Sequence, residues 1–149
     1  MSRVLTDKEK EYLLRFSETR RMMRKPADLQ ARYGGEHGLD GEYGTQGEFF
    51  AFDDGDCGQN ETTGVIDYNK PPSTQPGLWC QWIPTEEGDG LEWNGGEKFY
   101  HYIEWLEYII KSFMVRWGIV VNGYVKWIGE DKFNDQGTIH VVNNVVTTS

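Results

Sequence analysis

The sequence predicts an α+β protein in which an antiparallel sheet is covered on one face by one long helix. All six tryptophans lie between Trp79 and Trp127. Because aromatic side chains bury the most apolar area, this window should hold the core. Short apolar runs there alternate with turn residues, and one longer run repeats its apolar residues at helical spacing. The expected order in the C-terminal half is β-β-α-β-β-β.

A helical segment, residues 1–33, precedes this window. Thr6 and Glu9 have the spacing of a capping box, and apolar residues follow at three- and four-residue intervals. We expect this helix to close on the basic run at 20–25, where cations suit the negative end of the helix dipole. Pro26 then stops the helix or opens a short second one.

Residues 34–77 form a loop-dominated segment rich in glycine and acidic residues. From Gly35 to Gly47 a glycine recurs every third residue, but the prolines of collagen are absent. Short strands are expected at 49–52 and 65–68. The run 53–58 resembles a calcium loop only superficially. Counted from Asp54, the sixth position, a glycine in an EF-hand, is Gln59, and the twelfth, a carboxylate, is Val65.

Residues 78–148 carry the strongest patterns. A helix is expected from about Glu97 to Trp117, with an apolar stripe facing the sheet. Asn122-Gly123 is the strongest hairpin signal in the chain, and a last short strand can follow Asn143-Asn144. The five strands are expected at 78–83, 91–93, 119–121, 124–128 and 138–142, and the optional last one at 145–146. At 149 residues, the three segments fit a single domain, residues 1–149.

The net charge of −9 is unevenly distributed. Residues 33–97 hold fourteen acids and a single base, Lys70, whereas residues 1–32 hold nine bases and five acids. An acidic body disfavours nucleic-acid binding, which needs a basic surface, and favours a protein partner with a basic surface. A solvated surface that aids solubility is the simpler alternative. The candidate contact residues are Asp53, Asp54, Asp56, Glu86, Glu87 and Asp89.

Direct nucleic-acid contact is expected, if anywhere, only at the basic run. Its members are Arg20, Arg21, Arg24 and Lys25. Helix-dipole complementation and a contact with the acidic body explain the run equally well.

No catalytic residue, metal site or cofactor is predicted, and the chain is not expected to be an enzyme. The histidines are scattered, and no zinc-binding or phosphate-binding spacing occurs. A carboxylate pair among Glu97, Glu104 and Glu107 stays open, although exposed helix charges explain these residues more simply. Two cysteines, Cys57 and Cys80, indicate reduced thiols, with a disulfide between them as the alternative.

A cytoplasmic location is expected. No run approaches the roughly 18 apolar residues of a membrane helix, and the first eight residues lack the apolar stretch of a signal peptide.

Several runs together resemble an uncharacterised family of small bacterial and phage-borne proteins over about residues 77–146. They are Gly77 to Trp82, Glu92 to Tyr100, Glu104 to Tyr108, Trp117-Gly118 and Asn122-Gly123. The resemblance implies a mobile-element context and brings no catalytic residue with it.

Two functions therefore remain. The first is an acidic interaction protein, such as an inhibitor or nucleic-acid mimic that acts on a basic host or defence protein. The second is a small-ligand binder, for example of a nucleotide, whose aromatic pocket lies between sheet and helix. The pocket candidates are Trp79, Trp82, Trp93 and Tyr100.

Overall fold

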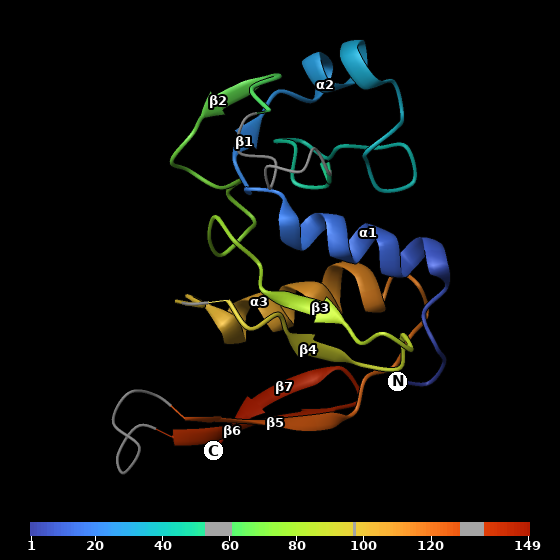
Figure 1. The fold of residues 1–149 in the computed structure, drawn as a ribbon, viewed down its shortest axis with the longest axis vertical. Coiled ribbons are helices and arrows are strands. Elements are labelled where there is room, and N and C mark those ends of the chain that lie inside the picture. Colours follow the sequence, from blue (N-terminus) through green and yellow to red (C-terminus); the bar gives the residue numbers. More distant parts are fainter. Residues whose placement is uncertain (53–60, 97, 129–135) are drawn as a thin grey trace. The chain divides into compact units, whose positions relative to one another are not determined.

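The computed structural model describes residues 1–52, 61–96, 98–128 and 136–149 (Figure 1). The fold is α+β, as the sequence predicts. The chain divides into two compact units, residues 5–102 and residues 1–4 with 103–149. The division falls close to the start of the central helix, so the window from Trp79 to Trp127 contributes to both units. The single-domain assignment stays a prediction.

Helix α1 (Asp7–Glu18) begins at the predicted capping box. Glu9 N donates to Thr6 Oγ1 at 3.1 Å, and Thr6 N donates to Glu9 Oε1 at 2.8 Å. The helix ends at Glu18, before the basic run that was expected to close it. Thr19 stops it in an extended conformation, and its hydroxyl donates to the carbonyl of Arg15 at 2.7 Å.

The basic run is extended and contains strand β1 (Met23–Arg24). Its backbone forms hydrogen bonds with three distant segments: Arg21 N donates to Leu78 O, Met23 N to Lys70 O and Arg24 N to Gln46 O. Because these bonds lie outside a helix ladder, they explain why α1 stops early. Strand β2 (Val65–Asp67) pairs antiparallel with β1.

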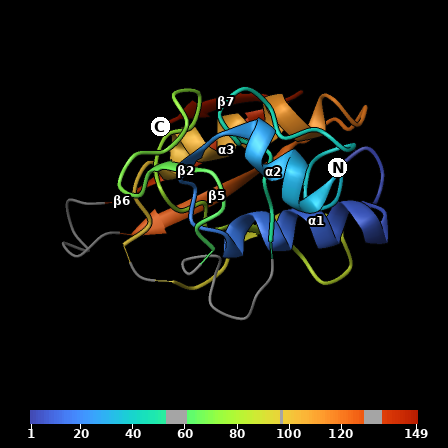
Figure 2. The same cartoon turned by 90° about the horizontal axis from the view of Figure 1, so that it is seen from above.

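Helix α2 (Pro26–Tyr33) opens at Pro26 as predicted. The chain between the two helices is extended, so α1 and α2 are separate helices in Figure 2. Gly34 ends α2 with a positive φ of 62°, which glycine adopts without steric cost.

The described part of the glycine-rich segment, residues 34–52, is irregular and still holds core residues. Tyr43, Phe50 and Leu29 of α2 form a buried cluster. The strand expected at 49–52 is absent, because the backbone bonds within the segment: Phe50 N donates to Gly47 O and Ala51 N to His37 O.

Strands β3 (Trp82–Pro84) and β4 (Leu91–Trp93) form the predicted hairpin, with Trp82 opposite Trp93. β3 begins four residues later than expected. Upstream of it, the carbonyl of Leu78 is taken by Arg21 N.

Helix α3 (Tyr102–Ile109) continues into a π-helical turn, η1 (Ile110–Met114). The helix starts later than expected because Lys98 and His101 have positive φ angles of 55° and 58°, which a right-handed helix excludes. Its apolar stripe is buried as predicted, at Leu106, Ile110 and Phe113.

The chain closes with the antiparallel sheet β5 (Gly123–Ile128), β6 (Gln136–Val142) and β7 (Val145–Thr148). The element order β-β-α-β-β-β is therefore present, with the strands divided between two sheets. The prediction of a hairpin at Asn122-Gly123 is wrong, because residues 119–122 form no strand in the structure. The tight turn lies at Asn143-Asn144, where φ is 48° and 69°.

Within the described residues, no helix is both long enough and apolar enough to cross a membrane.

Candidate functional site

The turn between β3 and β4 presents three of the predicted acidic contact residues on a fixed backbone. Glu86, Glu87 and Asp89 are all exposed. The hydroxyl of Thr85 accepts hydrogen bonds from Asp89 N at 3.2 Å and Gly90 N at 3.1 Å, and it donates to Asp89 Oδ1 at 2.6 Å. The side chain of Thr85 thus holds the turn from within.

The same turn is attached to the start of α1. Leu5 N donates to the carbonyl of Gly88 at 2.8 Å. Lys10 Nζ donates to the backbone carbonyl of Glu86 at 2.7 Å. Gly88 is buried with φ of 74°, and a Cβ there would lie 2.8 Å from the side chain of Lys10. The positive φ explains the glycine, because side chains with a Cβ rarely adopt it, whereas the flexible Lys10 side chain could move aside.

The attachment brings further acidic residues near the turn. Asp7 and Glu9 lie in the first turn of α1, a few residues after Leu5. Glu9 is engaged in the capping box, whereas Asp7 is exposed. Lys10 is bonded to a carbonyl oxygen and not to a carboxylate of the turn. The surface formed by the exposed carboxylates of the turn, Glu86, Glu87 and Asp89, is called the acidic turn surface below.

The other three predicted contact residues, Asp53, Asp54 and Asp56, lie outside the described residues.

The four aromatic residues expected to line a pocket differ in their surroundings. Trp82 is buried, its ring packs edge-on against Phe99 at 5.4 Å, and its Nε1 donates to the carbonyl of Tyr102 at 2.7 Å. Trp93 lies opposite Trp82 in the hairpin and is 54% exposed. Tyr100 is 67% exposed.

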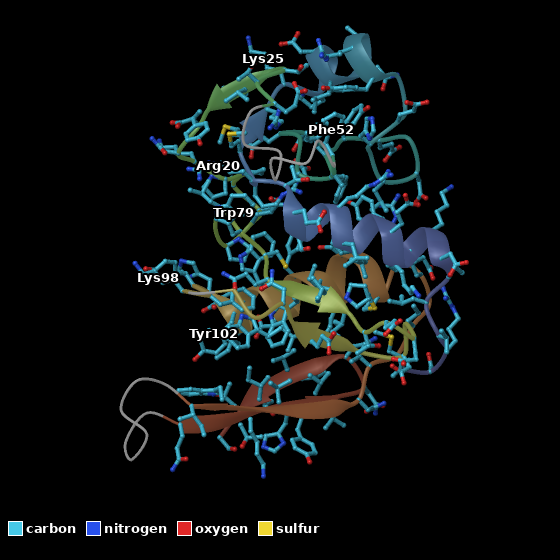
Figure 3. All side chains as sticks on the ribbon, in the orientation of Figure 1. Arg20, Lys25, Phe52, Trp79, Lys98 and Tyr102 are labelled. Carbon is cyan, nitrogen blue, oxygen red and sulfur yellow. The ribbon has the colours of Figure 1, made fainter. Side chains whose placement is uncertain are left out.

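The structure thus brings Trp82 and Trp93 together, by strand pairing. Trp79 is half-buried, outside β3 (Figure 3). The Nε1 of Trp93 donates to Gln81 Oε1 at 3.1 Å. Both indole N–H groups of the pair are therefore engaged by protein oxygens.

Two arginines of the basic run are inside the protein. Arg21 and Arg24 are each 1% exposed, and their guanidinium groups stack over Phe16 and Phe50 at 4.0 and 4.6 Å. Arg21 donates to backbone carbonyls at Phe16, Glu48 and Phe50, and Arg24 donates to that of Thr63.

The remaining two members of the run are more accessible. Arg20 stacks on Tyr68 and donates to its carbonyl, whereas Lys25 is exposed (Figure 3). Half of the expected basic patch is therefore unable to reach a phosphate backbone. The arginines join the extended run to the irregular segments 48–50 and 63.

An aromatic cluster that the sequence reasoning missed lies beside α2. The ring of His37 packs edge-on against Tyr33 at 5.2 Å and against Phe52 at 4.7 Å. Burial lowers the pKa of His37, and the charge of Arg15 lowers it further. Burial raises the pKa of Tyr33. The only sequence signal was the recurrence of aromatic residues around the glycines.

Glu61 lies close to this cluster. Burial acts to raise the pKa of Glu61, but hydrogen bonds from Thr63 bring it below the ordinary value of a glutamate. Thr63 N donates to Glu61 Oε1 at 2.8 Å.

An open depression of about 450 Å³ lies between α2 and the loop at 41–44. Its volume falls within the usual range of ligand pockets, but such pockets are mostly lined by apolar and aromatic side chains. Here Tyr43 is the one aromatic residue of the lining. Its hydroxyl donates to the carbonyls of Gly34 and Glu36. The depression shares no residue with the predicted aromatic pocket.

No group of three or more metal-binding side chains occurs among the residues that the structure describes. Cys80 is a free, buried thiol, and burial raises its pKa to about 12, so it is a poor nucleophile at neutral pH. Cys57 and Glu97 lie outside the described ranges, while Glu104 and Glu107 are exposed on α3.

Comparison with known proteins gives no match: no family model, no curated protein and no solved structure matches the chain. The resemblance over residues 77–146 stays a prediction.

Proposed function

We propose that the chain is a non-enzymatic binding protein whose acidic surface contacts a basic partner. An inhibitor or nucleic-acid mimic of a bacterium, a phage or another mobile element would act in this way. The observation that carries the proposal is the acidic turn surface, where exposed carboxylates stand on a backbone fixed by hydrogen bonds. Preorganised charges lose little conformational entropy on binding.

The charge distribution gives the proposal further support. Fourteen acids face one base in residues 33–97. Arg21 and Arg24 are buried and bonded to backbone carbonyls, so neither offers a cation at the surface to a partner. A field of one sign accelerates encounter with a partner of opposite sign.

The proposal is tested by capturing a partner from the host lysate and measuring its binding kinetics at two salt concentrations. Association should slow as salt rises, because screening shortens to about 8 Å near 0.15 M ionic strength. The double variant Glu86→Gln/Glu87→Gln should reduce the association rate constant by about tenfold, within the range seen among variants of one interface.

The matched control is Glu104→Gln/Glu107→Gln. It changes the net charge by the same amount on exposed positions of α3. An equal effect of both pairs would assign the attraction to total charge and not to the acidic turn surface. Salt-independent binding, or a co-purifying small molecule without a protein partner, would favour the ligand-binding alternative at Trp79, Trp82, Trp93 and Tyr100.

A further inference from the structure

The sheet β5–β6–β7 has one buried and one exposed face. Side chains alternate between the faces along each strand. Ile139 and Val141 of β6 point to the buried face and are 1% and 5% exposed. The register places Tyr124 opposite His140, His140 opposite Thr147, and Val142 opposite Val145, all on the other face. We call this second face the outer sheet face.

The outer sheet face carries large apolar residues in the open. They are Tyr124, Ile128, Val142 and Val145, each more than 60% exposed. Val142 and Val145 are direct cross-strand neighbours, and Tyr124 lies diagonal to Val142, a separation of about 7–8 Å. Tyr124, Val142 and Val145 are contiguous and expose on the order of 350 Å², within the range of the largest apolar patch of a typical monomer, which is often functional. Ile128 pairs with Gln136 and adds apolar area at the other end of the face.

The charge of this face differs from that of the rest of the chain. Its described positions include Lys126 and His140, and no aspartate or glutamate is among them. The chain as a whole carries a net charge of −9. Two copies therefore repel each other in most relative orientations. At the outer sheet face they can approach without bringing the aspartates and glutamates of one copy against those of the other.

We propose that two copies of the chain associate through the outer sheet face. Faces of sheets pack at about 10 Å with their side chains interdigitated. A standard interface buries about 800 Å² per partner, and the four apolar residues supply more than half of that area. Lys126, Thr138, His140 and Thr147 complete the face with polar groups. The same patch on both copies forms a two-fold interface.

This inference is independent of the proposed function. It concerns a different surface, and the two kinds of contact respond to salt in opposite directions. Apolar association persists or strengthens as salt rises. Binding through the acidic turn surface weakens under the same conditions.

The test is sedimentation equilibrium of the whole chain over a wide range of concentrations. The wild type should approach twice the 17.2 kDa of one chain. Val142→Lys should raise the dimer dissociation constant by about tenfold or more, because it places two added charges in an apolar contact. Near-ultraviolet circular dichroism checks that the variant is folded, and Val145→Lys replaces it if it is not.

The matched control is Ile66→Lys, on β2 in the other unit, where the native side chain is 52% exposed. It makes the same chemical change at a similar exposure and should dimerise like the wild type. A wild type that stays at 17.2 kDa at every concentration would overturn the proposal. So would a folded Val142→Lys variant that dimerises as well as the control.

Discussion

At the scale of single residues, Arg21 and Arg24 have a structural role that their place in a basic run conceals. Sequence reasoning offered three interpretations: a patch for nucleic acid or a partner, cations that complement the dipole of the first helix, or a contact with the acidic body of the chain. The structure instead places both guanidinium groups on aromatic rings, with donors directed to backbone carbonyls. An irregular segment without strand partners needs such donors, because buried carbonyls must be satisfied.

Arg21→Ala should therefore lower the free energy of unfolding by about 2–4 kcal/mol, since it leaves buried carbonyls at Phe16, Glu48 and Phe50 without their donor. Urea denaturation measures the loss. Lys25→Ala, in the same basic run but exposed, should stay within about 0.5 kcal/mol. Equal losses for the two variants would contradict a structural role for Arg21.

His37 predicts a dependence of stability on pH. Its pKa is lowered in the folded protein, chiefly by burial, so the unfolded chain binds more protons at His37. The folded state is then favoured at pH above the ordinary histidine value of about 6.5, and stability falls as pH drops below it towards the folded-state pKa.

The variant His37→Asn should lose less stability than the wild type between pH 7.5 and pH 5.5. Asparagine tolerates the positive φ of 65° at this position. Urea midpoints at the two pH values give the comparison, in which the carboxylates common to both proteins cancel. A wild type and variant with the same pH dependence would show that His37 is not the titrating group.

At the scale of elements, local signals were reliable where one side chain determines the geometry. The capping box at Thr6, Pro26 at the start of α2 and the buried stripe of α3 could all be predicted. The signals failed where distant segments compete for the same backbone. Residues 119–122 lack a strand because Val120 N bonds Ser2 Oγ and Val121 N bonds Asn144 Oδ1, contacts that no local pattern contains.

At the turn Asn143-Asn144, the contribution of the backbone conformation can be distinguished from that of side-chain hydrogen bonds. Both residues have positive φ, but Asn144 also accepts a hydrogen bond from Val121 N at 2.7 Å and donates to Ile119 O at 3.2 Å. Asn144→Gly should cost about 1–2 kcal/mol, because those partners lose their bonds. Asn143→Gly should be neutral within about 0.5 kcal/mol, because its side chain is not required for the turn.

Thermal unfolding of the two glycine variants provides the measurement. A greater loss for Asn143→Gly would contradict this prediction, because it would show that the side chain of Asn143 stabilises the turn more than the bonds of Asn144 do.

At the scale of the whole molecule, the sequence indicated the α+β class and the C-terminal sheet. The core, however, was expected only in the window from Trp79 to Trp127, and it extends beyond that window. Buried apolar residues also occur throughout the first half, at Leu13, Phe16, Leu29 and Phe50 among others. Leu13 and Phe16 fall on the apolar spacing predicted for the first helix, whereas Phe50 and its neighbours were missed because glycines interrupt every period in residues 34–52. Among the candidate contact residues, the sequence predicted the local backbone conformation only for Glu86, Glu87 and Asp89, which lie on a recognisable hairpin turn.

The single-domain assignment makes a prediction about cooperativity. If residues 1–149 are one domain, the two units should unfold together in urea, because one domain usually unfolds in an all-or-none transition. Hydrogen exchange followed by mass spectrometry can monitor peptides from 5–102 and from 103–149 separately. Two distinct midpoints would show that the units unfold independently.

The burial of Arg21 and Arg24 also changes what an approaching molecule encounters. The formal charge of −9 counts every ionisable side chain equally, yet two cations and one carboxylate, Glu48, are buried among the described residues. The side chains left in contact with solvent are thus more negative as a group than the formal charge. Long-range repulsion and electrophoretic mobility still follow the formal charge, because a buried guanidinium keeps its charge. What changes is direct contact: a carboxylate of an approaching molecule cannot pair with Arg21 or Arg24.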